Sequence, residues 1–173
     1  TRYALCYSLP STCSRLEALD MMRLTLSTLA CLLLVTGTFA ADVLKAGDSA
    51  PPFAVNKFVK GEPVKELQLG QIYVIEFWAT WCGPCIDNIP KITAMQQKHG
   101  KKVVFIGVSV WERDQTKVVP FVNKQGSKMN YRVAMDKVGA NQQANQGHMA
   151  TRWLKAAGKN GIPCAFIIDK EGK

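Results

Sequence analysis

The chain has 173 residues, of which 47% are hydrophobic and 20% charged, which suits one globular domain with a sizeable core. Lysine and arginine outnumber the acids by 22 to 13, for a net charge of +9. The basic residues are scattered and no aromatic side chains alternate with them, which argues against binding to nucleic acid. We interpret this charge mainly as a solvated basic surface, with a mild preference for acidic partners or anionic membranes.

The first forty residues are not expected to belong to the folded domain. Residues 1–20 fit neither a core nor a targeting signal, and we interpret them as sequence upstream of the natural start. Residues 21–40 resemble a secretory signal peptide, because Arg23 precedes the apolar run 24–35 and residues 38–40 offer a cleavage site before Ala41. The apolar run is short for a membrane span, and an uncleaved anchor is the alternative. We therefore expect an exported protein.

Residues 41–173 read as alternating strands and helices, the pattern of an α/β domain. Residues 72–78 are too apolar for a half-exposed strand, so we expect this strand to be central and buried on both faces. The expected strands, in chain order, are 53–55, 64–65, 72–78, 103–109, 131–134 and 165–169, and the expected helices are 84–98, 115–124 and 142–157.

The last residues of the chain have the composition of a hairpin turn, Lys170-Glu171-Gly172. A hairpin requires a partner strand, which the sequence does not contain beyond Lys173. We expect a C-terminal strand and a helix to be missing, so that 41–173 would be a C-terminally truncated domain.

The motif Trp81-Cys82-Gly83-Pro84-Cys85 stands between the predicted strand 72–78 and the predicted helix 84–98. The start of a helix stabilises a thiolate through free backbone N–H groups and the helix dipole. Two residues between the cysteines permit a small disulfide ring that opens and recloses. The spacing therefore predicts dithiol–disulfide chemistry. A zinc site is not expected, because a second C-x-x-C or paired histidines are lacking.

A longer pattern around this motif resembles the thioredoxin superfamily. It comprises the run 76–85, Pro90, the lead-in 47–53 and Gly161-Ile162-Pro163. The leader and the long stretch before Gly161 are similar to the TlpA/ResA-type (redoxin) branch. The resemblance implies a thioredoxin-like fold, with a central mixed sheet flanked by helices. It also implies a thiol–disulfide oxidoreductase in the periplasm, or anchored to the membrane and facing it, that needs no cofactor.

The resemblance assigns roles to the residues of the motif. Cys82 matches the nucleophilic cysteine of the family and Cys85 the resolving one. Trp81 would offer substrate an apolar landing surface, and Gly83 and Pro84 complete the loop that substrate meets. The Gly-Pro pair resembles that of reducing thioredoxins, so we favour a reductant of protein disulfides. Its expected partners are dithiol or disulfide proteins and an upstream redox protein.

Three further positions, Ile162, Pro163 and Glu76, are singled out. The Ile162–Pro163 bond matches the family's cis bond beside the disulfide, where exposed backbone can pair with an extended substrate. Glu76 interrupts an apolar strand where thioredoxin has a buried acid. We expect its pKa to be raised and its role to be accepting a proton from Cys85 through water. The alternative for Glu76 is a pairing with a lysine, such as Lys57 or Lys91, or exposure to solvent at the end of a strand.

Two positions depart from the family pattern. Asn88 stands where the ResA-type group commonly has a glutamate, so a carboxylate role is lost there. Cys164 stands where a threonine is usual. Strand alternation should turn its side chain away from the disulfide and against a helix, as a buried, structural cysteine.

Two other functions remain open. A peroxiredoxin-like peroxide reductase needs a threonine three residues before its cysteine, and Ala79 occupies that place. A copper-binding chaperone could use the two thiols as soft ligands, but Pro84 and the lack of a well-placed histidine or methionine argue against it.

Overall fold

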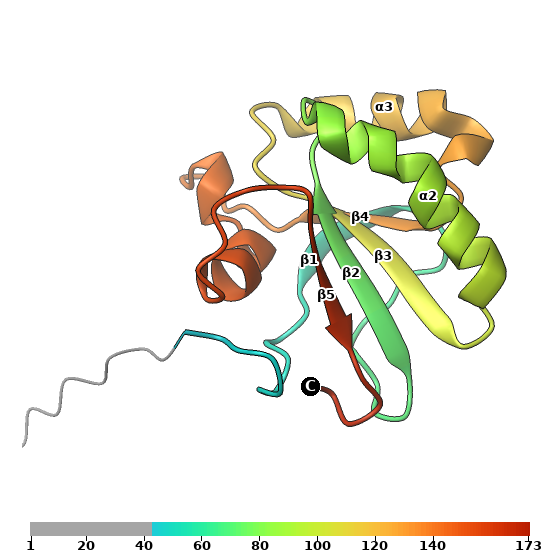
Figure 1. The fold of residues 1–173 in the computed structure, drawn as a ribbon. Coiled ribbons are helices and arrows are strands. Elements are labelled where there is room, and N and C mark those ends of the chain that lie inside the picture. The colour runs from blue at the N-terminus through green and yellow to red at the C-terminus, as the bar shows by residue number, and fades with distance from the viewer. Residues whose placement is uncertain (1–42) are drawn as a thin grey trace, which may run out of the picture. The chain divides into compact units, whose positions relative to one another are not determined.

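A computed structural model describes residues 43–173 (Figure 1), so the predictions for residues 1–40 lie outside the described residues. The described strands are β1 (Val55–Lys60), β2 (Ile72–Trp78), β3 (Val103–Ser109), β4 (Arg132–Asp136) and β5 (Cys164–Ile168). The helices are α2 (Gly83–His99) and α3 (Val118–Gln125), with 3-10 segments η1 (Gln115–Lys117), η2 (Gly126–Lys128) and η3 (Ala144–Gln146) and the π-helix η4 (Ala150–Lys155). In this part of the chain, no helix has the length and hydrophobicity that crossing a membrane requires.

The strands form one sheet in the order β1-β4-β3-β2-β5. The pairs β2–β3 and β3–β4 are parallel, whereas β1–β4 and β2–β5 are antiparallel. The predicted mixed sheet is therefore confirmed, and β2 has neighbours on both sides, as its apolar sequence indicated. The C-terminal end of β2 leads directly into the loop that precedes α2.

Three of the predicted elements differ from the structure. The strand predicted at 53–55 is displaced, because β1 begins at Val55 and extends to Lys60. Residues 64–65 do not form a strand, because β1 pairs with the distant β4 instead of folding into a local hairpin. The predicted helix 142–157 is broken at Gly147, whose extended ψ of 155° ends η3. A new helical turn begins beyond it because the buried carboxylate of Asp136 accepts hydrogen bonds from the backbone N–H groups of Met149 (2.8 Å) and Ala150 (3.1 Å).

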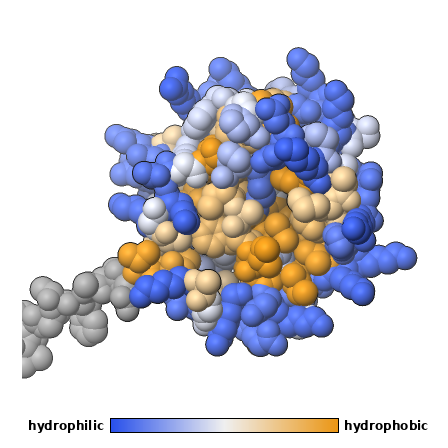
Figure 2. Space-filling model, in the orientation of Figure 1, coloured by the Kyte–Doolittle hydropathy of each residue, from blue (hydrophilic) through white to orange (hydrophobic). Residues whose placement is uncertain are grey.

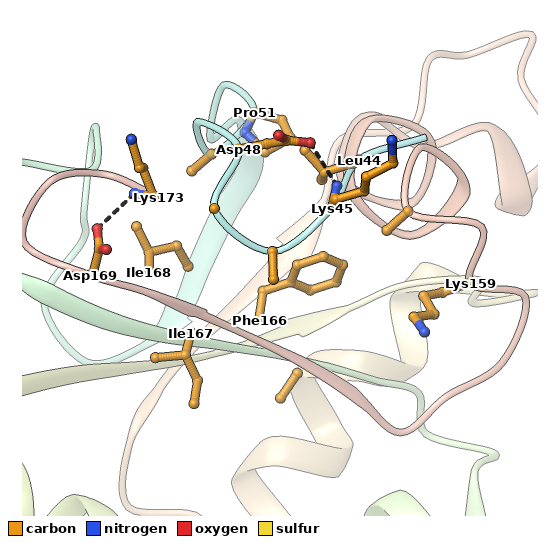
Figure 3. Close-up of a pocket in the computed structure, with 15 residues that line it drawn as sticks. Leu44, Lys45, Asp48, Pro51, Lys159, Phe166, Ile167, Ile168, Asp169 and Lys173 are labelled. Atoms are coloured by element: carbon orange, nitrogen blue, oxygen red, sulfur yellow. Dashed lines mark hydrogen bonds between the residues drawn. The ribbon is translucent and has the colours of Figure 1, made fainter. Parts of the chain in front are cut away.

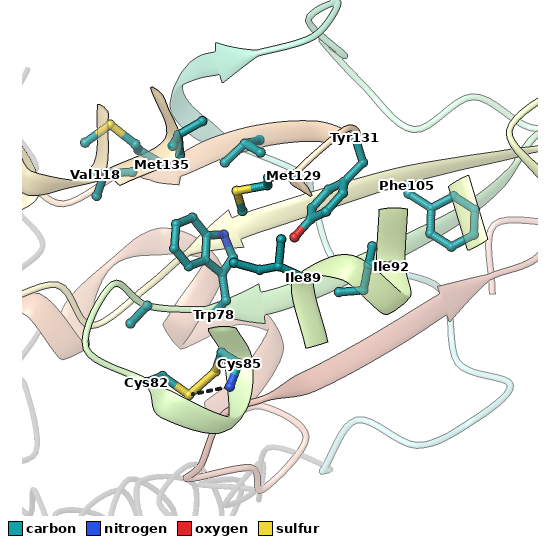
Figure 4. Close-up of a cluster of buried hydrophobic side chains, with 13 residues drawn as sticks. Trp78, Cys82, Cys85, Ile89, Ile92, Phe105, Val118, Met129, Tyr131 and Met135 are labelled. Carbon is teal, nitrogen blue, oxygen red and sulfur yellow. Dashed lines mark hydrogen bonds between the residues drawn. A yellow bond between two sulfur atoms is a disulfide. The ribbon is translucent and has the colours of Figure 1, made fainter. Parts of the chain in front are cut away.

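The two faces of the sheet carry separate apolar clusters. The cluster under α2 and α3 contains Trp78, Ile89 and both cysteines of the motif (Figure 4). The cluster on the opposite face lies under η4, where Trp153 meets Phe166 edge-on at 5.5 Å between ring centroids. Because side chains alternate along β2, its even-numbered residues face α2 and its odd-numbered residues face η4.

The outer edge of β5 is open and partly apolar among the described residues. Ile167 is 72% exposed and Leu69 is 76% exposed, and apolar side chains gather on this part of the surface (Figure 2). A cavity of about 490 Å³ lies beside the strand, between Phe166 and the lead-in from Leu44 to Pro51 (Figure 3). None of the three cysteines in the described residues lines this cavity.

Candidate active site

The two cysteines of the motif lie at the N-terminus of α2 and form a disulfide, with 5.2 Å between their Cα atoms. Cys82 is the N-cap residue, and the backbone N–H of Cys85 donates to the Cys82 sulfur over 3.3 Å. Pro84 occupies the first turn, where a missing N–H costs no helical hydrogen bond. That turn carries no acidic residue, so the positive end of the helix dipole acts on the Cys82 sulfur unopposed.

The two cysteines differ slightly in their exposure to solvent. Cys82 is 5% exposed and Cys85 is fully buried, whereas Trp81 is 55% exposed and Gly83 and Pro84 lie on the surface. Cys82 is therefore the more accessible of the two cysteines, and it lies next to the exposed Trp81.

The chain returns to the disulfide just before β5. The Ile162–Pro163 peptide bond is cis, as expected, and the carbonyl oxygen of Ile162 lies 3.8 Å from the Cys82 sulfur. Pro163 is exposed, while Ile162 is half-buried between the two apolar clusters. The structure thus brings together the motif and the distant proline that the sequence singled out.

Glu76 is buried beneath α2. It lies on β2 between Gly107 of β3 and Ala165 of β5, on the same face of the sheet as Trp78. Its side chain is 6% exposed, and neither carboxylate oxygen has a hydrogen-bond partner among the described residues. Burial raises the pKa of Glu76 to about 8.

The alternative pairing of Glu76 with a lysine is wrong. Lys91 instead donates to the Asn88 side chain over 3.1 Å, on the exposed side of α2. Lys57 is exposed on β1, at the far edge of the sheet from β2.

Two further buried polar groups surround Gly107, and the sequence reasoning missed them. A Cβ atom on Gly107 would lie 2.9 Å from the Tyr131 ring and 3.2 Å from the Trp78 indole nitrogen. The Tyr131 hydroxyl and this nitrogen are buried without a partner among residues 43–173. Burial raises the pKa of Tyr131, and the nearby charge of Glu76 adds to this effect. A glycine within a buried strand was the signal for this close approach.

A second carboxylate, Glu112, holds the loop that precedes the motif. It accepts hydrogen bonds from the Thr80 backbone N–H (2.6 Å), the Thr80 hydroxyl (2.8 Å) and the Ser109 hydroxyl (2.8 Å). Next to it, Trp111 has a φ of 56°, a left-handed conformation that costs energy for a bulky residue, and its carbonyl accepts from the Trp81 indole over 3.1 Å. The loop after β3 therefore fixes both residues that precede Cys82.

The third cysteine is separated from the disulfide. Cys164 is a free thiol that packs against the cluster on the η4 face, the side that strand alternation predicted, but it is half-buried and not fully buried as expected. Burial raises the pKa of its thiol. Within residues 43–173, no group of three or more histidine, cysteine or acidic side chains is placed to hold a metal ion.

Comparisons with known proteins agree with this geometry. The profile of the AhpC/TSA family matches residues 46–173. Protein FixW of Rhizobium leguminosarum is 30% identical over 139 residues, which cover 76% of this chain and 59% of FixW. The thiol-disulfide oxidoreductase ResA of Bacillus anthracis is 30% identical over 142 residues, which cover 81% of this chain and 73% of ResA.

Solved structures share the fold. The thioredoxin domain of a thiol-disulfide oxidoreductase from Bacteroides vulgatus superposes with a TM-score of 0.57 at 21% identity, over 75% of this chain and 85% of that one. StoA from Bacillus subtilis superposes with a TM-score of 0.52 at 20% identity, over 73% and 86% of the two chains. The chain belongs to the AhpC/TSA family and is a thiol–disulfide oxidoreductase of thioredoxin-like fold.

Proposed function

We propose that this oxidoreductase reduces disulfides of proteins outside the cytoplasm, with Cys82 as the nucleophile and Cys85 as the resolving thiol. The observation that carries the proposal is the asymmetry of the pair at the N-terminus of α2. Cys82 keeps a small exposed fraction of 5% and accepts a backbone hydrogen bond, whereas Cys85 is fully buried.

In the first step, the Cys82 thiolate attacks one sulfur of the substrate disulfide. A bond forms between the two sulfurs, and the other substrate sulfur leaves as a thiolate that takes up a proton. The Cys85 N–H, 3.3 Å from the Cys82 sulfur, and the helix dipole stabilise the attacking thiolate.

In the second step, the Cys85 thiol loses its proton and attacks Cys82. The bond between Cys82 and the substrate breaks, the substrate leaves as a dithiol and the Cys82–Cys85 disulfide remains. We assign the proton to the Glu76 carboxylate, reached through water, because Glu76 lies on the face of β2 that α2 covers and carries no competing partner among the described residues. With a pKa of about 8, Glu76 is a stronger base than an exposed glutamate.

The surface around Cys82 suits an extended polypeptide. Trp81, Gly83 and Pro84 are exposed on one side of the disulfide, and the Ile162–Pro163 segment lies on the other. We assign these residues to substrate binding, with backbone pairing along the segment before β5 and apolar contact on Trp81.

The direction and location of the reaction are part of the proposal. The Gly83-Pro84 pair and the signal-like residues 21–40 favour an exported reductant. It would receive electrons from an upstream redox protein, and the apolar segment could tether it to the membrane.

An insulin-reduction assay tests the activity, with dithiothreitol as the electron source and metal analysis of the same sample. Wild-type protein should accelerate the precipitation of insulin chains, and Cys82→Ser should not. Stoichiometric copper with no acceleration would contradict the proposal in favour of a copper chaperone. Peroxide consumption without insulin reduction would contradict it in favour of a peroxide reductase.

The role of Glu76 is tested by following the two steps separately in a stopped-flow experiment. In wild-type protein, release of the mixed disulfide should accelerate as the pH rises towards 8, because Glu76 ionises there. Glu76→Gln should lose this acceleration and leave the first attack unchanged. Equal slowing of both steps, or of neither, would contradict the assignment.

A further inference from the structure

An open groove of about 740 Å³ lies between the loop after β3 and the segment before β5. We call it the amide groove, because most of its polar lining consists of glutamine and asparagine side chains. The residues that carry the argument below are Trp111, Gln142, Gln143, Gln146, Lys155 and Lys159.

The amide groove is continuous with the surface around the disulfide. On one side, Trp111 lines the groove and its carbonyl accepts the hydrogen bond from the Trp81 indole. On the other side, Asn160 lines the groove two residues before Ile162, whose carbonyl lies 3.8 Å from the Cys82 sulfur. A polypeptide whose disulfide meets Cys82 therefore has its flanking residues within reach of the groove.

The amide side chains offer this polypeptide hydrogen-bond donors. The side-chain oxygen of Gln142 accepts from the backbone N–H of Gly139, and Gln143 and Gln146 accept from each other's backbone N–H groups in a capping box. Their oxygens are thus engaged, and within residues 43–173 their NH₂ groups make no hydrogen bond. A glutamine in this state donates two hydrogens, which suits carbonyl and carboxylate oxygens.

The charges in the groove have a single sign. Lys155 on η4 and Lys159 beyond it are both exposed and line the groove, and none of its lining residues in the described chain is acidic. Cationic side chains together with NH₂ donors form a surface complementary to aspartate and glutamate.

We propose that the amide groove binds the segment of the substrate protein that flanks its disulfide, and that it selects segments carrying aspartate or glutamate. The inference rests on the proposed function, because it names the substrate class of the same site. Since both lysines are exposed, they act mainly on the encounter with substrate, and the selectivity weakens as salt screens them.

The test uses three disulfide peptides with the same residues around the disulfide and an acidic, a neutral or a basic flank. At low ionic strength, the reduced wild-type protein should reduce the acidic peptide about three- to tenfold faster in kcat/KM than the neutral one, as expected for two exposed charge pairs. The basic peptide should be reduced more slowly than the neutral one. The preference should shrink in high salt.

Two double variants separate the groove from the overall charge. Lys155→Glu with Lys159→Glu should reverse the order of the peptides, which a merely structural effect would not do. Lys98→Glu with Lys101→Glu, at two exposed lysines near the end of α2, makes the same change in net charge away from the groove and should keep the order. Equal rates for all flanks, or equal effects of the two double variants, would overturn the proposal.

A binding measurement keeps this test apart from the redox reaction. The acidic flank alone, without cysteines, is titrated into oxidised wild-type protein and into the Lys155/Lys159 double variant. Weaker binding to the variant supports the groove even if no peptide is reduced, in which case only the proposed function fails. Reduction of all three peptides with equal binding to both proteins overturns the groove and leaves the proposed function standing.

Discussion

Replacing Glu76 with glutamine should change how the stability of the domain depends on pH. The pKa of Glu76 rises from its ordinary value of 4.5 to about 8 on folding, because the carboxyl group is buried. The folded protein therefore holds a proton over the range in which the unfolded chain releases it. The contribution of Glu76 to the free energy of unfolding is fully present below pH 4.5, and it is lost as the pH rises to about 8. Glutamine has the same shape but does not titrate, so the variant should not lose stability as the pH rises.

The size of the effect follows from the two pKa values. Each unit of difference corresponds to about 1.4 kcal/mol, so the full difference approaches about 5 kcal/mol above pH 8. At pH 7 the folded carboxyl group is still mostly protonated, and the variant should be more stable than wild type by about 3 kcal/mol. Near pH 5 the difference should shrink to about 1 kcal/mol.

Urea unfolding of the two oxidised proteins across pH 5 to 8.5 measures this difference directly. The other buried acid with a raised pKa, Asp136, is not affected by Glu76, so its contribution is the same in both proteins and cancels in the comparison. A pH-independent difference between wild type and Glu76→Gln would refute the reasoning, because it would mean that Glu76 titrates alike in the folded and unfolded states.

Three other substitutions test the contacts around the site. Glu112→Ala leaves three hydrogen-bond donors without an acceptor and should lower the free energy of unfolding in urea by about 3 kcal/mol. The variant should also reduce insulin more slowly. An unchanged unfolding midpoint would contradict the role of Glu112. Gly107→Ala places a methyl group 2.9 Å from the Tyr131 ring and should destabilise by about 1–3 kcal/mol, whereas a neutral effect would mean that the ring moves freely. Cys164→Thr should keep insulin-reduction activity, and in the reduced wild-type protein Cys164 should alkylate more slowly than Cys82; equal labelling rates, or a Cys82–Cys164 disulfide, would show a redox role.

The parts of the site that lie in one stretch of chain were predictable from the sequence. The strand 72–78, the motif and the following helix occur as expected, because hydrophobic periodicity and capping are local properties. Ile162 and Pro163 were placed beside the disulfide by resemblance alone, since no local pattern brings a segment 80 residues away to Cys82.

The parts that depend on distant contacts were not predicted. Glu112 accepts a hydrogen bond from Thr80, 32 residues earlier, and no feature of the sequence around Glu112 indicates this contact. The break in the predicted helix 142–157 depends on Asp136, whose buried carboxylate caps a helical turn 13 residues later. In both cases a buried acid stabilises backbone N–H groups of another segment, and only the folded chain identifies the pairing.

Trapping of the reaction intermediate tests the central claim most directly. Reduced Cys85→Ser protein is mixed with a disulfide peptide, and the products are analysed by mass spectrometry. The account predicts a stable mixed disulfide on Cys82, because the resolving thiol is absent. It predicts no adduct on Cys85 in the Cys82→Ser protein, because that cysteine is buried. An adduct on Cys85 in the Cys82→Ser protein, formed as fast as the one on Cys82, would contradict the assignment of nucleophile and resolving thiol.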